Sequence, residues 1–152
     1  MANDPGTVYR DDDSIPDDEL IYRMVIESNT KWSDTGEALR AATNAFQDRR
    51  EEDLEELGVP AVAVSVYIAS EMAARNVTPA DLVSRWGEKY GVASITAGEV
   101  RLHGQGVIRW AQPEHPEHGM IFAKVGQRKS GGQSSKLAKA SRIVIAPIRS
   151  GP

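Results

Sequence analysis

The chain has 152 residues, a length that fits one domain with its own hydrophobic core. It contains no cysteine, which excludes disulfides, thiolate metal sites and cysteine nucleophiles and favours a reducing compartment, so we expect a cytoplasmic protein. The first residues lack the basic and apolar regions of a signal peptide, and Pro60 and Ser65 interrupt the longest apolar run (59–69), so we expect no membrane segment.

Charge is distributed unevenly along the chain. Residues 1–60 carry 16 acidic and 6 basic side chains, whereas residues 61–152 carry 6 acidic and 12 basic ones. Such asymmetry is typical of an interaction surface or a charged tail. The alternative is that the two halves pack against each other and neutralise their charges.

The N-terminal region divides into a polar lead-in and a first structured element. Residues 1–14, with three successive aspartates, are expected to form a disordered acidic lead-in to a single domain over 15–148, followed by a tail over 149–152. Acidic residues after Pro16, and then apolar residues at helical spacing, predict a helix through residue 25. A strand over Leu20–Ile26 is the alternative.

The middle of the chain predicts a loop, a helix, a buried strand and two more helices. Residues 29–36 read as a loop anchored by Trp32, residues 39–46 have helical spacing, and residues 48–56 are a charged helix face or an exposed loop. Valines and isoleucine alternate with small residues over 62–68, which indicates a central strand. A helix is expected over 69–75, and Thr78 followed by Pro79 predicts the start of another.

The C-terminal part predicts strands around a short helix and a second helix near the end. We expect a strand over 92–96, a helix over 97–103, an antiparallel pair over 106–111 and 120–125, a helix starting at Ser134 or Ser135, and a last strand over 143–145. The sequence therefore predicts an α+β fold with a mixed or antiparallel sheet of about five strands and helices packed on one side.

The segment from Glu114 to His118 carries the most reactive side chains. Imidazole and carboxylate are ligands for zinc and similar metals, which makes His115 and His118 weak metal candidates. Their spacing is poor and Pro116 opposes a helix, so we predict no metal site and no cofactor. A polar hairpin loop is the alternative, and His118 is also a candidate general base because imidazole titrates near neutral pH.

Two further segments are candidates for binding. Clustered cations in a glycine- and serine-rich region suggest an anion or partner site, although Gly132 stands where a phosphate-binding loop would have lysine. These cations are Arg128, Lys129, Lys136, Lys139 and Arg142. Arg101, just after a Thr–Ala–Gly turn at 96–98, could line a cleft. The alternatives are a solvated loop and a helix cap with surface charges.

Six short motifs occur in one order along the chain. They are Ile21–Tyr22–Arg23, Ala45–Phe46–Gln47–Asp48, Ser65–Val66–Tyr67, Thr96–Ala97–Gly98 with Arg101, His118 at a strand start, and the run from Lys136 to Arg142. This order resembles a group of small bacterial proteins with no established activity, over nearly all of the chain after residue 15. The resemblance implies a shared fold.

A second resemblance involves fewer positions. Tyr22–Arg23, Trp32, Tyr67 and Glu71 are similar in order to residues of RES-type toxins, which act on NAD through an ADP-ribosyltransferase-like fold. The resemblance implies that Arg23 binds the NAD phosphates and that Tyr67 lines the nicotinamide pocket. The glycine-rich stretch of those toxins is replaced by residues 30–33 here.

Three functions follow from these observations. We expect a non-enzymatic interaction or accessory protein of bacterial origin, acting with an operon-encoded protein partner. The first alternative is an enzyme that binds NAD or another nucleotide, with Arg23, Tyr67, Arg101 and His118 as candidate catalytic residues. The second is nucleic-acid binding through residues 128–142. A single pocket holding the four candidate residues would favour the enzyme.

Overall fold

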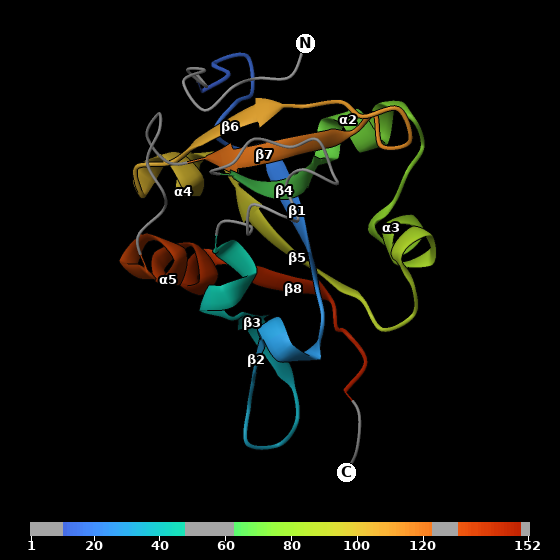
Figure 1. Cartoon of the computed structure of the whole chain (residues 1–152), viewed down its shortest axis with the longest axis vertical. Helices are drawn as coiled ribbons and strands as arrows, with labels where there is room; N and C mark the ends of the chain where they lie inside the picture. Colours follow the sequence, from blue (N-terminus) through green and yellow to red (C-terminus); the bar gives the residue numbers. More distant parts are fainter. Residues whose placement is uncertain (1–10, 48–62, 123–130, 150–152) are drawn as a thin grey trace.

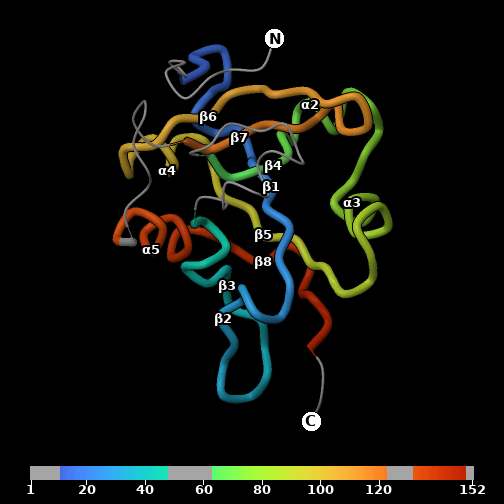
Figure 2. The backbone as a smooth tube through the Cα atoms, in the orientation of Figure 1, coloured from blue at the N-terminus to red at the C-terminus, as the bar shows by residue number. Residues whose placement is uncertain are grey.

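The computed structural model describes residues 11–47, 63–122 and 131–149. These residues form a six-stranded antiparallel sheet, a two-stranded sheet and four α-helices, which confirms a single α+β domain (Figures 1 and 2). None of the described helices is long and apolar enough to span a membrane. The strands of the large sheet are β1 (Leu20–Val25), β4 (Ala63–Ile68), β5 (Gly91–Thr96), β6 (Gly106–Arg109), β7 (His118–Phe122) and β8 (Arg142–Ile145).

The large sheet has the strand order β6-β7-β4-β1-β5-β8, so β1 lies in its middle. Ile21 of β1 pairs with Ile68 of β4 on one side and with Ile95 of β5 on the other. The helix expected over residues 16–25 is therefore wrong, and the strand alternative is correct. A central strand is buried on both faces, so its apolar residues do not alternate, and over six positions they mimic a helical stripe.

The region after β1 also differs from expectation. The predicted loop over 29–36 contains β2 (Thr30–Trp32), and the predicted helix over 39–46 is replaced by β3 (Ala38–Ala41) and a short 3₁₀ helix, η2 (Thr43–Phe46). A second 3₁₀ helix, η1 (Glu27–Asn29), precedes β2. Strands β2 and β3 pair as a hairpin with Gly36 at a φ of 86° in the turn. The residues of β3 are Ala, Leu, Arg and Ala, which are good helix formers, so pairing with β2 overrides their local propensity.

The remaining helices agree with the sequence prediction. They are α2 (Ala69–Ala74), α3 (Pro79–Trp86), α4 (Ala97–Leu102) and α5 (Gly131–Ala140). Thr78 caps α3 and Thr96 caps α4, each through a reciprocal capping box with an acidic residue three positions later. Helix α5 begins before the expected serine caps, and the Ser134 hydroxyl instead donates to the Phe46 carbonyl, 3.1 Å away. The charged segment 48–56 lies outside the described residues.

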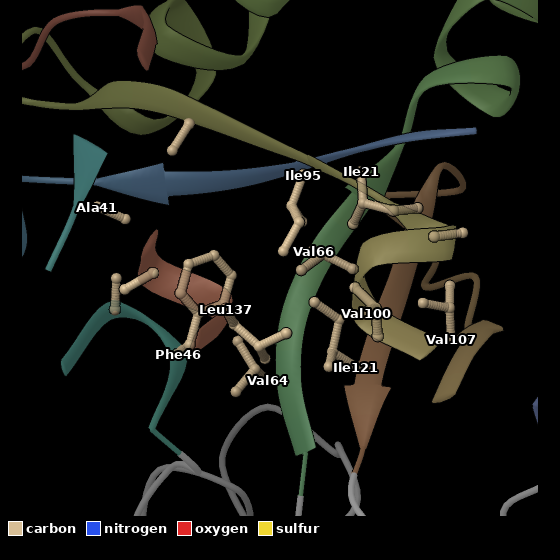
Figure 3. Close-up of a cluster of buried hydrophobic side chains, with 14 of the residues drawn as sticks. Ile21, Ala41, Phe46, Val64, Val66, Ile95, Val100, Val107, Ile121 and Leu137 are labelled. Carbon is tan, nitrogen blue, oxygen red and sulfur yellow. The ribbon is translucent and has the colours of Figure 1, made fainter. Parts of the chain in front are cut away.

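Helices cover both faces of the sheet rather than one. Side chains from alternate positions of β4, such as Val64 and Val66, pack with Leu137 of α5 and Val100 of α4 in the main core (Figure 3). The opposite face packs against α2 and α3 in a smaller cluster of apolar side chains. That cluster contains Met24, Tyr67, Met72, Leu82 and Val92. The expectation of helices on a single side is therefore wrong.

The acidic residues just before β1 are held against the edge of the sheet. The Asp12 N–H donates to the Val107 carbonyl at 2.9 Å, and the Val107 N–H donates to Oδ1 of Asp11 at 2.9 Å. Residues 11–14, which we expected within a disordered lead-in, thus cover the outer edge of β6. Residues 1–10 lie outside the described part of the chain.

Candidate functional site

The four candidate catalytic residues do not share one place. Tyr22 pairs with Tyr67, so these two side chains lie on the same face of the sheet and Arg23, the next residue, points to the other face. The Arg23 guanidinium donates to the Ala45 carbonyl at 2.7 Å and to the Ser65 carbonyl at 3.1 Å. Arg23 and Tyr67 therefore face opposite sides of the sheet.

Arg101 lies at a third place, on α4. Its guanidinium contacts the Asp11 carboxylate at 2.9 Å, the Asp17 carboxylate at 2.7 Å and the Asp12 carbonyl at 2.9 Å. All three contacts are to the acidic residues before β1. Arg101 thus anchors that segment to the end of the sheet. Thr96 is the N-cap of α4, which agrees with the alternative of a helix cap with surface charges.

Tyr67 is the centre of a hydrogen-bonded cluster on the α3 side of the sheet. The indole Nε1–H of Trp86 donates to the Tyr67 hydroxyl at 2.8 Å, and Nδ1 of His115 lies 3.0 Å from the same hydroxyl. Arg85, which can only donate, also approaches that Nδ1, at 3.2 Å. Nδ1 is therefore the acceptor, and the Tyr67 hydroxyl donates to it.

A buried carboxylate completes this polar cluster. Glu117 is 1% exposed and forms an ion pair with Arg85 of α3. The bond to Glu117 is the main reason that the pKa of Arg85 is raised further above its usual value. Burial raises the pKa of the Tyr67 hydroxyl, although the bond from Trp86 opposes the shift. At neutral pH the cluster therefore holds a charged pair beside a neutral phenol.

His118 is a cross-strand neighbour of Tyr67 but makes different contacts. It is 4% exposed, and its ring meets the Tyr67 ring edge-on with 6.1 Å between centroids. Its Nδ1 lies 2.8 Å from the Trp110 carbonyl, which can only accept, so Nδ1 carries a proton. Among the described residues no group of three or more side chains could hold a metal ion.

The polar cluster of Tyr67, Arg85, Trp86, His115 and Glu117 joins three elements: β4, α3 and the loop between β6 and β7. Sequence reasoning singled out Tyr67 and the histidines but not Arg85 or Trp86. The available signal was their position in the last turn of a well-capped helix. No sequence spacing links that turn to residue 117, because the contact depends on the tertiary fold.

The cations proposed for partner binding divide into two groups. Arg128 and Lys129 lie outside the described residues. Lys136 and Lys139 are exposed on α5, whose Leu137 and Ala138 face the core, and Arg142 is exposed at the start of β8. Arg40 lies on β3, which packs beside both α5 and β8. We call Arg40, Lys136, Lys139 and Arg142 the basic surface.

The basic surface differs from the cations of the rest of the sheet. Within the described ranges, none of its four members has a carboxylate within ion-pair distance. By contrast, the arginines of α3, α4 and β6, and Arg75 just after α2, all form ion pairs. These pairs are Arg75–Glu71, Arg85–Glu117, Arg101 with Asp11 and Asp17, and Arg109 with Asp12 and Glu71. Ion pairs within the chain thus neutralise these arginines, whereas among the described residues cations without an ion pair remain around α5 and β8 and also at the exposed residues Lys31 and Lys89.

No protein-family model matches the chain, and comparisons with curated proteins and with solved structures found no match either.

Proposed function

We propose that this protein is a non-enzymatic interaction protein that binds an acidic segment of a partner protein through the basic surface. The observation that carries the proposal is the contrast between paired and unpaired cations. Arginines around the α4 and β6 side of the sheet are neutralised by carboxylates of the same chain. The exposed cations of α5 and β8 and the half-buried Arg40 of β3 have no such carboxylate within the residues that the structure describes.

The docked residues before β1 illustrate the kind of contact that is proposed. Arg101 and Arg109 hold the carboxylates of Asp11, Asp12 and Asp17 at 2.7 to 2.9 Å. Each such surface pair contributes only about 0 to 1 kcal/mol, so a partner needs several of them together. The basic surface offers four cations for that purpose.

The arrangement of the candidate catalytic residues favours binding over catalysis. Arg23, Tyr67 and Arg101 lie at three separate places, and each is engaged by groups of this chain. The Nδ1 atoms of His115 and His118 are also engaged. An enzyme that binds NAD would need Arg23 and Tyr67 on the same side of the sheet.

Nucleic acid is a weaker candidate for the basic surface. The chain carries a net charge of −4, and the four cations of the basic surface are few compared with the phosphate contacts that support non-specific binding.

The same proposal includes a bacterial origin, a cytoplasmic location and an operon-encoded partner. The resemblance to small bacterial proteins and the lack of cysteine support them.

Reversal of the charges on the basic surface tests the proposal. The baits in a cross-linking pull-down from cell lysate are the wild type, the variant K136E/K139E/R142E and a control variant. The control is Lys89→Glu, which changes an exposed lysine after α3. We expect the wild type and the control to retain partner proteins that the triple variant loses. Equal capture by all three would contradict the proposal, and capture of DNA instead of protein would favour the nucleic-acid alternative.

A further inference from the structure

Exposed apolar side chains gather next to the basic surface. Among the described residues, six large apolar side chains are exposed, and three of them lie on β3, on β8 and just after β8. Leu39 is 50% exposed, Val144 is 45% exposed and Ile148 is 57% exposed. We call these three residues the apolar strip.

Contacts at both ends show that the chain after α5 runs beside β3. At one end, the Ala41 N–H donates to the Ser141 hydroxyl at 3.0 Å. At the other end, the Arg149 guanidinium lies 5.1 Å from the centre of the Trp32 ring. Gly36 is also close to Arg149, because a Cβ atom at that position would lie 3.0 Å from Nη1 of Arg149. The two segments are therefore antiparallel neighbours, and β3, which carries Leu39, lies beside β8, which carries Val144 (Figure 1).

The two edge strands of the large sheet differ in their backbone hydrogen bonds. Among the described strands, β8 pairs with β5, through a register shift between Val92 and Ala93 that leaves Val144 between the paired residues Ile143 and Ile145. The other edge strand, β6, is covered by hydrogen bonds with Asp11 and Asp12. Strand β3 packs beside β8, but among the described residues no backbone hydrogen bond joins the two strands.

We infer that the partner segment is acidic and amphipathic: its apolar side chains bury the apolar strip while its carboxylates meet Arg142 and the lysines of α5. This inference rests on the proposed function and specifies the partner of the same surface. Exposed apolar side chains bordered by unpaired cations favour a ligand that supplies both apolar contact and negative charge. A protein segment supplies aliphatic side chains and carboxylates together, whereas the bases of a nucleic acid stack best on aromatic side chains, and the apolar strip contains none.

A second copy of this chain fits the strip less well. If two copies met through Leu39, Val144 and Ile148, the cations of both basic surfaces would face one another, and like charges across an interface are unfavourable. Strand β8 also has features that discourage pairing with itself, since it is short, carries Arg142 and is followed by Pro147. An acidic partner removes the repulsion.

Three probes separate these possibilities in one fluorescence-anisotropy experiment with the full chain. The first is a synthetic peptide that alternates glutamate and leucine, the second replaces its leucines with serine, and the third is single-stranded DNA. We expect the leucine peptide to bind at least about tenfold more tightly than the serine peptide, because burial of even one leucine contributes that factor. Equal binding of the two peptides, or tighter binding of DNA, would overturn the inference.

Variants of the strip provide the second part of the test. We expect L39S/V144S/I148S to bind the leucine peptide at least about tenfold more weakly, and Leu102→Ser, which changes an exposed leucine on α4 (77% exposed), to bind like the wild type. Circular dichroism of each variant checks folding. If K136E/K139E/R142E loses binding while the strip variant keeps it, the inference fails and the proposed function stands. If neither variant changes binding, both fail.

Discussion

Nη1 of Arg109 lies 2.7 Å from Oδ2 of Asp12, so a side chain of edge strand β6 holds a residue from the start of the described chain. The same Nη1 donates to the Ser14 hydroxyl at 2.7 Å, and Nε of Arg109 contacts Glu71 of α2 at 3.2 Å. Together with Arg101, this residue converts an acidic segment into the cover of one sheet edge. The opposite edge, β8, has no hydrogen-bonded segment of this kind among the described residues, although β3 packs beside it, and the proposed partner surface lies there.

Removing both anchoring arginines should release the acidic segment. In R101A/R109A we expect faster hydrogen exchange at the amides of Asp12 and Val107, because their mutual contacts depend on the docked segment. Each exposed pair contributes about 1 kcal/mol or less, so the loss of global stability should stay small. Arg75→Ala, which removes the i,i+4 pair with Glu71, is the control. Unchanged exchange at both amides in the double variant would show that the backbone bonds suffice.

Acid should release the same segment. The bond from the Ser14 side chain is the main reason that the pKa of Asp12 lies below its usual 3.8, and the bond from Arg75 likewise holds the pKa of Glu71 below 4.5. A lowered folded-state pKa stabilises the fold above the usual pKa, and this contribution is lost as the pH falls through the folded value. We expect Ser14→Ala to raise the Asp12 pKa in an NMR titration. An unchanged value would mean that the Ser14 N–H and Arg109 lower the Asp12 pKa without the hydroxyl.

Breaking the Arg85–Glu117 pair should destabilise the domain strongly. Arg85→Ala leaves the 1% exposed carboxylate of Glu117 without its cation, which costs about 3 kcal/mol, at the lower end for buried pairs because the Arg85 side chain is 30% exposed. The double variant R85M/E117L buries no charge, so we expect it to unfold at a higher urea concentration than Arg85→Ala. A double variant less stable than the single one would mean that the pair itself stabilises the fold.

The Tyr67 hydroxyl should matter more than that of Tyr22, its neighbour on the same face of the sheet. Tyr67→Phe leaves the indole N–H of Trp86 without its acceptor and Nδ1 of His115 with only the longer contact to Arg85, which costs about 1 kcal/mol because Trp86 is 38% exposed and its indole can be hydrated. Tyr22→Phe is the matched control. Urea unfolding gives the stability of each variant, and the indole ¹⁵N–¹H shift of Trp86 reports the broken bond. Equal stabilities of the two variants would contradict the assigned role of the cluster.

Several elements could be predicted because their signals are local. The alternating valines of β4 and the capping residues Thr78 and Thr96 act within a few positions of themselves. The candidate sites could not be predicted equally well. His115 and Tyr67 were visible as reactive residue types, but their link to Arg85 and Trp86 joins positions that are distant along the chain.

By itself, the sequence determined the α+β class, the capped helices, the strand at 63–68 and the uneven charge. Only the tertiary structure decided that residues 20–25 are a central strand, because pairing with both β4 and β5 satisfies their backbone groups and buries both of their faces. Only the tertiary structure decided which cations are neutralised. Ion pairs form between side chains that the fold brings within a few ångströms, so Arg109 meets Asp12 although 97 positions separate them, and the described cations around β8 meet no carboxylate among the residues that the structure places.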